Sequence, residues 1–586
     1  MSDKTGDKFI DEAKERYKVA VDGWKDIYDQ AREDLKFTYD VDNGQWEQEV
    51  LNKRAGRPTI TVNKLQKFVR QSRGDFGMNR PSMKVIPVDD KADVQMAELY
   101  NGILRQIEYT SNAPIVYDTA YMYALSSSVG FWRLLTEYSG EDTFNQDIKI
   151  QRILDPFSVH FDPFAKEFNL EDAEFCFIET LMDEEAFKKK YPKSDLINFD
   201  GDPSVFGEWI KDKKVRLCEY YKKEYFKKKI ALLSDGQTIE LNKENIQVLP
   251  LSGLTVVRER EISAHKVKWY LINGLEVLEE TEWAGSGIPV IPMFGDEVIV
   301  DGRRYYLSLI RGAKGSQQMY NYWASAATEN VMLTPKTPFI LDHRQIKGFE
   351  REWEDSNINP RVYLRYNAVP GLQKPQRESQ TQVPAAIINM MQSTAYDIED
   401  HLGRYEASKG DTSNERSGKA IIARIAQSEK GTYTFMDNAA RSIIAGLRQI
   451  VELIPKIYDT PRALNILGEN GERGVVQVNQ PIVDAQGNDA IGNDLSVGKY
   501  DVIATVGASF GSKREEMVKM LIEASQYAPM LAPVIIPFVF KYSDWPGAQE
   551  VFAAIQQTVQ AQQQAAVNEQ VNNQGIESAA YQQVRQ

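Results

Sequence analysis

The stretch 405–425, YEASKGDTSNERSGKAIIARI, holds the residues whose types and spacing come closest to a chemical motif. Its closing SGKA resembles the end of a phosphate-binding loop, which requires G-x-x-x-x-G-K-[ST] with a final hydroxyl for Mg²⁺. Counting back from Gly418, the first glycine position is occupied by Ser413, and Lys419 is followed by Ala420. The stretch also lies between two expected helices and does not follow a strand. A nucleotide site is therefore not expected here, and no cofactor is predicted.

Other candidate chemistry is weaker. His160 and Asp162 could be catalytic partners, but no serine or cysteine nucleophile motif lies near them. The acidic segment 161–175 does not have the spacing of a calcium loop and lacks a glycine for its sharp turn, so an exposed acidic turn is favoured. The four histidines are scattered, without Cys or His partners at metal-ligand spacing. We predict neither a catalytic site nor a metal site.

The basic aromatic stretch KKEYFKKK, residues 222–229, could stack on nucleic acid. The favoured alternative is an exposed strand edge on which lysines prevent pairing with other strands.

Composition restricts the remaining possibilities. The 586 residues are 42% hydrophobic, so the chain can bury hydrophobic cores. Its formal net charge of −14 argues against a protein that binds DNA tightly over its whole surface. Cys176 and Cys218 are the only cysteines, which favours a reducing, cytosolic compartment over a disulfide scaffold. No apolar run reaches about 18 residues, and the charged N-terminus lacks the apolar region of a signal peptide, so no membrane association is expected.

Hydrophobic periodicity predicts an α+β protein. Helices are expected over 8–39, over 63–77 with Asn63 as the cap, and over 91–128 with a possible break at Ala113-Pro114. Short β-branched and aromatic runs across 130–300 predict a mostly antiparallel sheet.

Beyond residue 306 the pattern becomes helical again. Helices are expected over 308–333 and 385–407, on either side of a proline-rich, strand-like insert, and a longer one over 417–458. Two long helices with a small module at their far end would leave much side surface exposed in a single subunit. Neighbouring subunits would cover that surface in a ring.

Four long segments carry a family resemblance: NKLQKFVRQSRGDFGMNRPSMKVIPV (63–88), ILDPFSVHFDPFAKEFNLEDAEFCFIETLMDEEAFKKKYP (153–192), LIRGAKGSQQMYNYWASAATENVMLTPKTPFIL (309–341) and ASKGDTSNERSGKAIIARIAQSEKGTYTFMDNAARSI (407–443). Together they resemble the portal proteins of tailed bacteriophages, most closely those of P22-like podoviruses. The resemblance implies a homododecameric ring at the unique capsid vertex of the virion, assembled in the host cytoplasm. Double-stranded DNA would be packaged and ejected through its channel.

The resemblance also implies a division of the chain. The parts would be a wing (1–305), stem helix 1 (306–333), a small β-containing clip (334–383), stem helix 2 (384–406), a channel loop (407–417), a long wing helix (418–459), the remaining wing and helical crown (460–555) and a Gln-rich C-terminal tail (556–586). The implied partners are the terminase large subunit, tail adaptor proteins, and the major capsid and scaffolding proteins.

Transient contacts with the DNA backbone are assigned to three cations of the loop: Lys409, Arg416 and Lys419. The alternative is that Arg416 and Lys419 pair with Asp411 or Glu415 at a helix start. The clip residues expected to meet terminase or adaptors mix aromatics and arginine, as interface cores do: Phe339, Ile340, Arg344, Phe349, Trp353, Tyr363 and Tyr366. Equally, the aromatics could form the clip's own small core.

Two other function classes compete with the portal interpretation. A DNA-processing enzyme such as a terminase or nuclease would need a phosphate loop or a convergent carboxylate cluster, and neither is found. A different head–tail connector or tail adaptor ring remains the alternative, although adaptors are generally far smaller.

Overall fold

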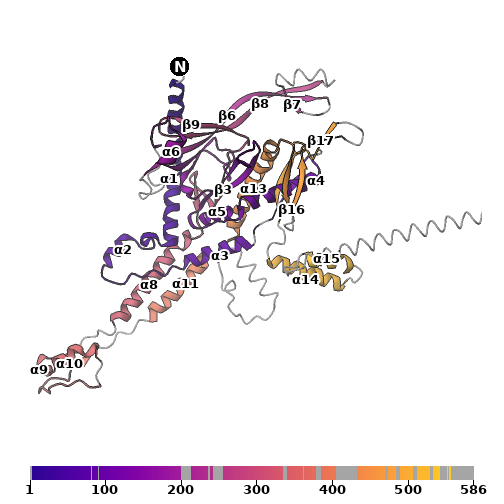
Figure 1. The fold of residues 1–586 in the computed structure, drawn as a ribbon. Helices are drawn as coiled ribbons and strands as arrows, with labels where there is room; N and C mark the ends of the chain where they lie inside the picture. The colour runs from indigo at the N-terminus through magenta and orange to yellow at the C-terminus, as the bar shows by residue number, and fades with distance from the viewer. Residues whose placement is uncertain are drawn as a thin grey trace, which may run out of the picture.

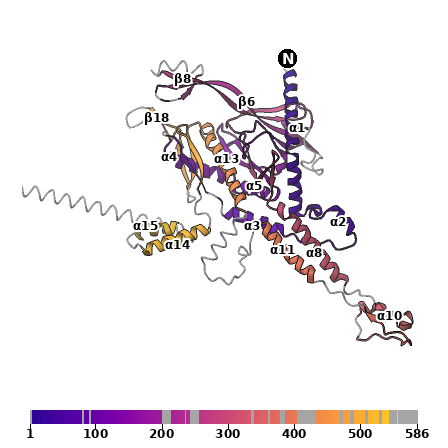
Figure 2. The same ribbon diagram turned by 180° about the vertical axis from the view of Figure 1, so that it is seen from behind.

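The computed structural model describes residues 3–78, 80, 82–89, 92–199, 213–234, 236, 238–241, 255–333, 339–359, 362–377, 385–403, 432–468, 473–483, 489–505, 511–527, 532–541, 551 and 554–555. These residues form a mixed α/β body, from which two helices project with a small module at their far end (Figures 1 and 2). A long two-stranded ribbon leaves the body at the opposite end.

The first helix, α1 (Asp3–Tyr39), runs along one flank of the body (Figure 1). Its buried side chains recur every three or four residues, as the sequence predicted: Ala13, Tyr17, Ala20, Trp24 and Tyr28. Trp24 donates its indole N–H to the Phe161 carbonyl oxygen at 3.0 Å, which fixes the helix against the sheet.

The next helices also follow the sequence. In α3 (Leu65–Met78) the Asn63 side chain caps the N-terminus by accepting the Leu65 amide at 3.1 Å. The expected long helix is two helices, α4 (Val94–Thr110) and α5 (Ala113–Ser127), because the chain turns at Asn112 before Pro114.

All strand pairs among the described residues are antiparallel. One sheet has the order β10-β2-β3, formed by Val290–Phe294, Val129–Tyr138 and Gln146–Arg152. A larger sheet has the order β4-β5-β6-β8-β9 with β7 beside β6, formed by Val159–Phe161, Phe175–Asp183, Lys214–Leu233, Val256–Ile272, Val277–Trp283 and Thr238–Glu240. The predicted antiparallel sheet of an α+β protein is confirmed.

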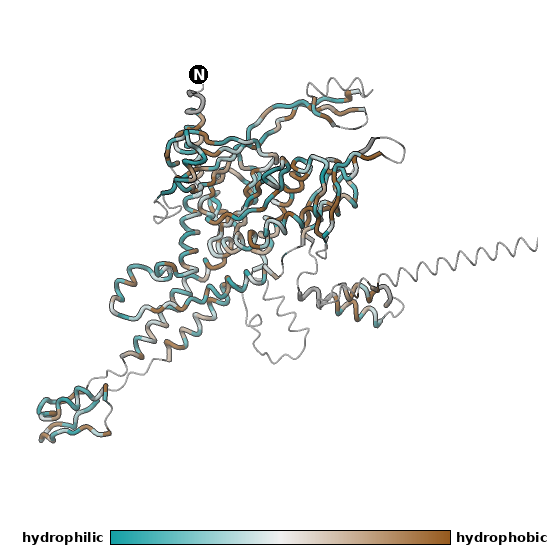
Figure 3. The backbone as a smooth tube through the Cα atoms, in the orientation of Figure 1, coloured by the Kyte–Doolittle hydropathy of each residue, from teal (hydrophilic) through white to brown (hydrophobic). Residues whose placement is uncertain are grey.

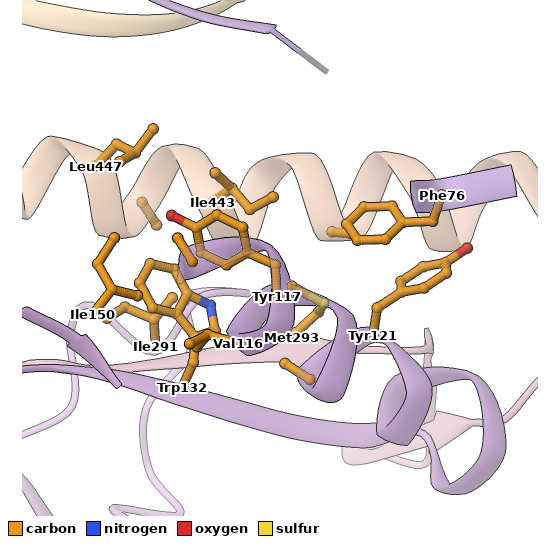
Figure 4. Packing of buried hydrophobic residues seen from close by; sticks show 14 of the residues in the cluster. Phe76, Val116, Tyr117, Tyr121, Trp132, Ile150, Ile291, Met293, Ile443 and Leu447 are labelled. Carbon is orange, nitrogen blue, oxygen red and sulfur yellow. The ribbon is translucent and has the colours of Figure 1, made fainter. Parts of the chain in front are cut away.

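Helix α13 (Tyr433–Ile457) closes the main core. Figure 4 shows Trp132 and Tyr117 beneath it, next to Ile443 and Leu447. Trp132 donates to the Ser442 hydroxyl at 3.0 Å, and a Cβ atom at Gly446 would overlap the Trp132 ring. The glycine is therefore required for this close approach. The start of the helix expected over 417–458 lies outside the described residues.

Strand β1 (Ser82–Pro87) pairs with β19 (Tyr500–Thr505), which joins distant parts of the chain. The other strands are β11 (Asp296–Val300), β12 (Arg303–Leu307), β13 (Phe339–Ile340), β14 (Gln376–Arg377), β15 (Arg462–Leu467), β16 (Arg473–Val478), β17 (Gln480–Val483) and β18 (Asp489–Gly492). The shorter helices are η1 (Val41–Asn43), α2 (Gln48–Lys53), η2 (Pro156–Ser158), α6 (Glu184–Lys190), η4 (Arg311–Ala313), α9 (His343–Ile346), α10 (Glu350–Glu354), η6 (Asp355–Asn357), α14 (Gly511–Tyr527) and α15 (Ala532–Lys541).

The two projecting helices are α8 (Lys314–Leu333) and α11 (Ala385–His401), which pack side by side (Figure 1). The helix expected over 308–333 begins later than the sequence predicted. Residues 303–307 pair with 296–300 in a hairpin, so the α-helix begins only at Lys314.

Candidate docking and conduit sites

A polar stripe ties α8 to the body. Gln317, Asn321 and Ser325 recur every four residues on one face of this helix, and all three are fully buried. Their side chains accept the backbone amides of an extended segment, residues 57–64, which we name the strap. The three amide bonds run from Lys64 to Gln317 at 3.1 Å, from Val62 to Asn321 at 3.0 Å and from Ile60 to Ser325 at 2.8 Å.

The spacing explains why this ladder fits. Alternate residues of an extended chain lie about 6.6 Å apart, and residues four apart in a helix lie about 6 Å apart along its axis. Alternate strap amides therefore meet successive turns of α8 in an antiparallel register. The helix side chains take the place of a neighbouring strand, which satisfies backbone groups that would otherwise be unpaired.

Ion pairs and amide contacts extend the ladder. Arg54 lies 3.0 Å from Glu329, near the far end of α8, and also donates to the Pro58 carbonyl oxygen at 3.0 Å. Asn321 donates from its Nδ2 to Oε1 of Gln45 at 2.8 Å. The position of α8 on the body is thus fixed mainly by directional polar contacts.

The outer sides of the helix pair are different, since they expose large apolar side chains. On α11 the buried residues are only Thr394 and Ile398 among its described positions. Exposed apolar residues of the pair are Met319, Tyr322, Val331, Met332, Ile388, Met390 and Tyr396. A surface of this kind on a projecting element is typical of a protein–protein contact.

The module at the far end of the helices, residues 339–377 where described, contains the seven predicted docking residues. Three of them contribute to its own packing. Phe339 and Trp353 meet edge to face at 5.0 Å between ring centroids, and the Arg365 guanidinium lies 4.7 Å from the Phe349 ring centroid. Trp353 also donates to the Arg365 carbonyl oxygen at 2.8 Å. These three residues therefore pack within the module itself, as the alternative of a small internal core predicted.

The other predicted residues lie on the surface of this module. Ile340, Tyr363 and Tyr366 are exposed, Tyr363 to 73%. Exposed apolar neighbours that the sequence reasoning missed are Ile358 and Val362. Their exposure could have been expected from the sequence, because an insert of this size cannot bury all its apolar residues.

Arg344 is exposed and already engaged. Its Nε and Nη2 donate to the two oxygens of Asp342 at 3.0 and 2.9 Å, while Asp342 caps α9 by accepting the Arg344 amide. The side-chain hydrogen bond from Arg344 and the backbone hydrogen bond lower the pKa of Asp342 to about 2. Arg344 therefore stabilises the local turn in the isolated chain.

The three predicted DNA contacts, Lys409, Arg416 and Lys419, lie outside the described residues, which stop at Gly403 and resume at Thr432. The described flanks are α11 and α13. The loop thus connects a projecting helix to a helix of the main core.

His160 and Asp162 are not partners. His160 is fully buried and its Nε2 lies 3.1 Å from Oε1 of Glu179, while Asp162 accepts the amides of Phe164 and Glu174. Asp162 is itself buried, so the expectation of an exposed acidic turn is wrong for this residue, whose carboxylate organises the loop. Among the described residues no group of three or more His, Cys, Asp or Glu is placed to hold a metal ion.

The basic stretch lies in β6. Lys222 is the last partner of β5, opposite Phe175, and beyond it β6 pairs with β8 on one side. On its other side no described strand pairs with residues 224–228, so this part is a strand edge, as the favoured interpretation predicted.

Comparisons with known proteins agree with this architecture. The chain matches the phage P22-like portal protein family over residues 14–586. It is 25% identical over 511 residues to the portal protein of Acyrthosiphon pisum secondary endosymbiont phage 1, covering 82% of this chain and 71% of that protein. The chain therefore belongs to the P22-like portal protein family, whose members are structural phage proteins and not known enzymes. Among its described helices, none has the length and apolar character needed to cross a membrane.

Proposed function

We propose that the chain forms a dodecameric ring at the unique capsid vertex, through which double-stranded DNA is packaged and later ejected. The observation that carries this proposal is the projecting pair α8–α11, with apolar side chains exposed along its outer sides and a small module at its end. One subunit cannot cover those sides, whereas neighbours in a closed ring would do so on every subunit.

In this ring α8 and α11 are the stem helices and the module 339–377 is the clip. The clip's exposed apolar residues form the docking surface for the terminase large subunit and, later, for tail adaptor proteins. The most exposed of them are Val362, Ile358 and Tyr363, with exposures of 102%, 78% and 73%. Aromatic and large apolar side chains of this kind contribute most to protein interfaces. Major capsid and scaffolding proteins would surround the wing in the virion.

The loop between α11 and α13 would face the channel and bring Lys409, Arg416 and Lys419 to the DNA backbone. An acidic protein, with a net charge of −14, holds the duplex weakly. A few cations repeated around a ring keep the DNA centred and leave it free to move, because each phosphate contact adds only a small, salt-dependent attraction.

Two experiments test the proposal. Electron microscopy of the purified protein should show rings with a central hole, and monomers with ATPase activity would refute it. Phage carrying Lys409→Glu, Arg416→Glu and Lys419→Glu should assemble rings but package or retain less DNA. The control is Lys53→Glu on α2, an exposed lysine that pairs only with its own helix. Normal genome retention in the triple variant would refute the loop assignment without affecting the ring.

A further inference from the structure

The ribbon formed by β6 and β8 continues well beyond the sheet that anchors it. The last β6 residue paired with β5 is Lys222, and the last β8 residue paired with β9 on that side is Val267. From Tyr225↔His265 to Leu232↔Arg258 the two strands pair mainly with each other. Two-stranded ribbons are marginally stable in water without further packing. Figures 1 and 2 show this one running from the sheet beside α1 across the end of the body, so that its far end lies on the side away from α1.

The two faces of the ribbon differ. One face, which we name the cationic face, combines three cations with apolar side chains: Lys228, Arg258, Arg260, Phe226, Ile230, Leu232 and Ile262. Figure 3 shows hydrophilic and hydrophobic residues following one another along this ribbon. Phe226 and Leu232 are 38% and 37% exposed, and Arg258 and Arg260 are exposed as well. Both faces of the ribbon reach solvent, but the opposite face carries mixed charges, since Lys227 and Lys229 stand beside Glu259 and Glu261. The cationic face is therefore distinguished by its excess of positive charge.

Two of its cations are available for a partner. Lys228 lies 3.2 Å from Glu240, but Arg258 and Arg260 are exposed and make no ion pair with any described residue. Exposed arginines beside apolar side chains are favoured at protein interfaces.

Nearer the body, the same face of the sheet already binds a helix within one subunit. The Phe9 ring of α1 lies 4.6 Å from the Tyr270 ring, and Lys222 lies 2.9 Å from Glu12. Arg16 donates to the Tyr220 hydroxyl at 3.1 Å. This face thus binds a helix through aromatic contacts and a lysine–carboxylate pair. The cationic face lies further along the same side of the strands and likewise combines cations with apolar side chains.

A matching helix surface occurs on α1. Its outward stripe, which we name the acidic stripe, recurs at helical spacing opposite the buried side: Asp11, Glu15, Asp22, Asp26, Asp29 and Glu33. The stripe extends over about 33 Å at 1.5 Å per residue, long enough to span the roughly 26 Å of the eight-residue ribbon. Lys18 and the exposed Val19 lie beside its N-terminal half.

The N-terminal half of the stripe is the part without partners. Asp26, Asp29 and Glu33 lie 3.8, 3.6 and 2.6 Å from Arg303, Arg32 and Lys314 respectively. Asp11, Glu15 and Asp22 form no ion pair within the described part of the chain. They lie toward the N-terminal end of α1, the end of the body that also carries the ribbon (Figure 1).

We propose that the cationic face of the β6–β8 ribbon of one copy docks on the acidic stripe of α1 of the next copy. A head-to-tail ring requires complementary surfaces on opposite flanks of each subunit, and α1 and the far end of the ribbon occupy such flanks. Arg258 and Arg260 pair with Asp11 and Glu15 across this contact, while Ile262, the next residue of β8 on the same face, covers Val19. The proposal rests on the ring of the proposed function and names one of its subunit contacts.

Charge exchange tests the contact. Arg258→Glu with Arg260→Glu should raise the protein concentration needed for ring assembly about tenfold, and more at low salt than at high salt. Combining it with Asp11→Lys and Glu15→Lys should restore assembly, since the opposite signs then meet again. The matched control is Glu259→Lys, on the same strand but on the opposite face of the ribbon. A folded ribbon variant that assembles like the wild type, or one that the exchange does not rescue, overturns the proposal.

Cross-linking supplies an independent readout. Cys176 and Cys218 are buried, and burial raises the pKa of both thiols, so a maleimide cross-linker reaches only introduced cysteines. Rings of Arg260→Cys/Glu15→Cys should give covalent dimers, trimers and larger species, and each single variant should give none. Rings without covalent species in the double variant count against this contact alone, whereas a wild-type protein that forms no ring refutes the proposed function.

Discussion

Replacing Asn321 by leucine should loosen the strap from α8. Asn321 accepts hydrogen bonds from the Val62 amide at 3.0 Å and from Gln317 Nε2 at 2.9 Å, and donates to Gln45 at 2.8 Å. Gln317 keeps its bond to the Val62 carbonyl oxygen at 2.9 Å, so leucine leaves two groups without a partner, the Val62 amide and the Gln45 side-chain oxygen. Each stranded group costs about 1–3 kcal/mol, and about 1.5 kcal/mol for each gives about 3 kcal/mol. The higher helix propensity of leucine offsets about 0.5 kcal/mol. The net loss of about 2.5 kcal/mol corresponds to about a 70-fold change in the opening equilibrium.

Hydrogen exchange with mass spectrometry measures this change directly. Peptides covering residues 57–65 should exchange about 70-fold faster in Asn321→Leu than in the wild type, because local opening exposes the strap amides. The control is Gln318→Leu on the same helix. Its side chain is outside the polar stripe and makes no hydrogen bond with the described residues, so the same peptides should keep their protection.

Unchanged protection of the strap in Asn321→Leu would show that the amide ladder does not hold α8 in place. Equal loss in both variants would point to a general effect of leucine on the helix. Either result would refute the assignment of the polar stripe as the element that sets the position of the stem.

Two further predictions concern the core and the clip. Gly446→Ala should lower the stability of the protein by about 1–3 kcal/mol, because the new Cβ atom overlaps the Trp132 ring. The control is Gly315→Ala on α8, which has open space where the Cβ atom would lie and should not lower the stability. Thermal unfolding of the two variants measures the difference. The hydrogen bonds with Arg344 lower the pKa of Asp342 to about 2, compared with about 3.9 for an aspartate in an unfolded chain. The helix cap that Asp342 provides is therefore fully stabilising above about pH 4 and is lost as the pH falls toward 2. Hydrogen exchange of residues 342–346, corrected for intrinsic rates, should show this loss in the wild type and no such step in Asp342→Asn.

Features set by neighbouring residues could be predicted from the sequence. The spacing of Tyr17, Trp24 and Tyr28 gave the buried side of α1, because helix periodicity depends only on the order of residues. The Asn63 cap and the break before Pro114 follow from equally local preferences for backbone geometry.

Features that depend on distant pairing could not be predicted. Nothing near Ser82–Pro87 indicates that its partner is Tyr500–Thr505. The helix expected from residue 308 begins only at Lys314 for the same reason, since the paired strands β11 and β12 and the turn η4 precede it. In the clip, composition could not separate Trp353, which packs inside, from Tyr363, which faces outward, because both roles favour aromatic residues.

The polar stripe of α8 was equally hidden, since Gln317, Asn321 and Ser325 have the composition of a solvent-facing surface. Its burial would have a use in the proposed ring. Apolar faces pack on any apolar neighbour, so a helix that bound both its own body and the next subunit through apolar residues could exchange one contact for the other. A ladder of hydrogen bonds accepts only the strap backbone in one register, because any other partner leaves buried polar groups unpaired. In the proposed ring α8 would thus be polar toward the strap of its own chain and apolar toward its neighbours, and the two contacts could not replace each other.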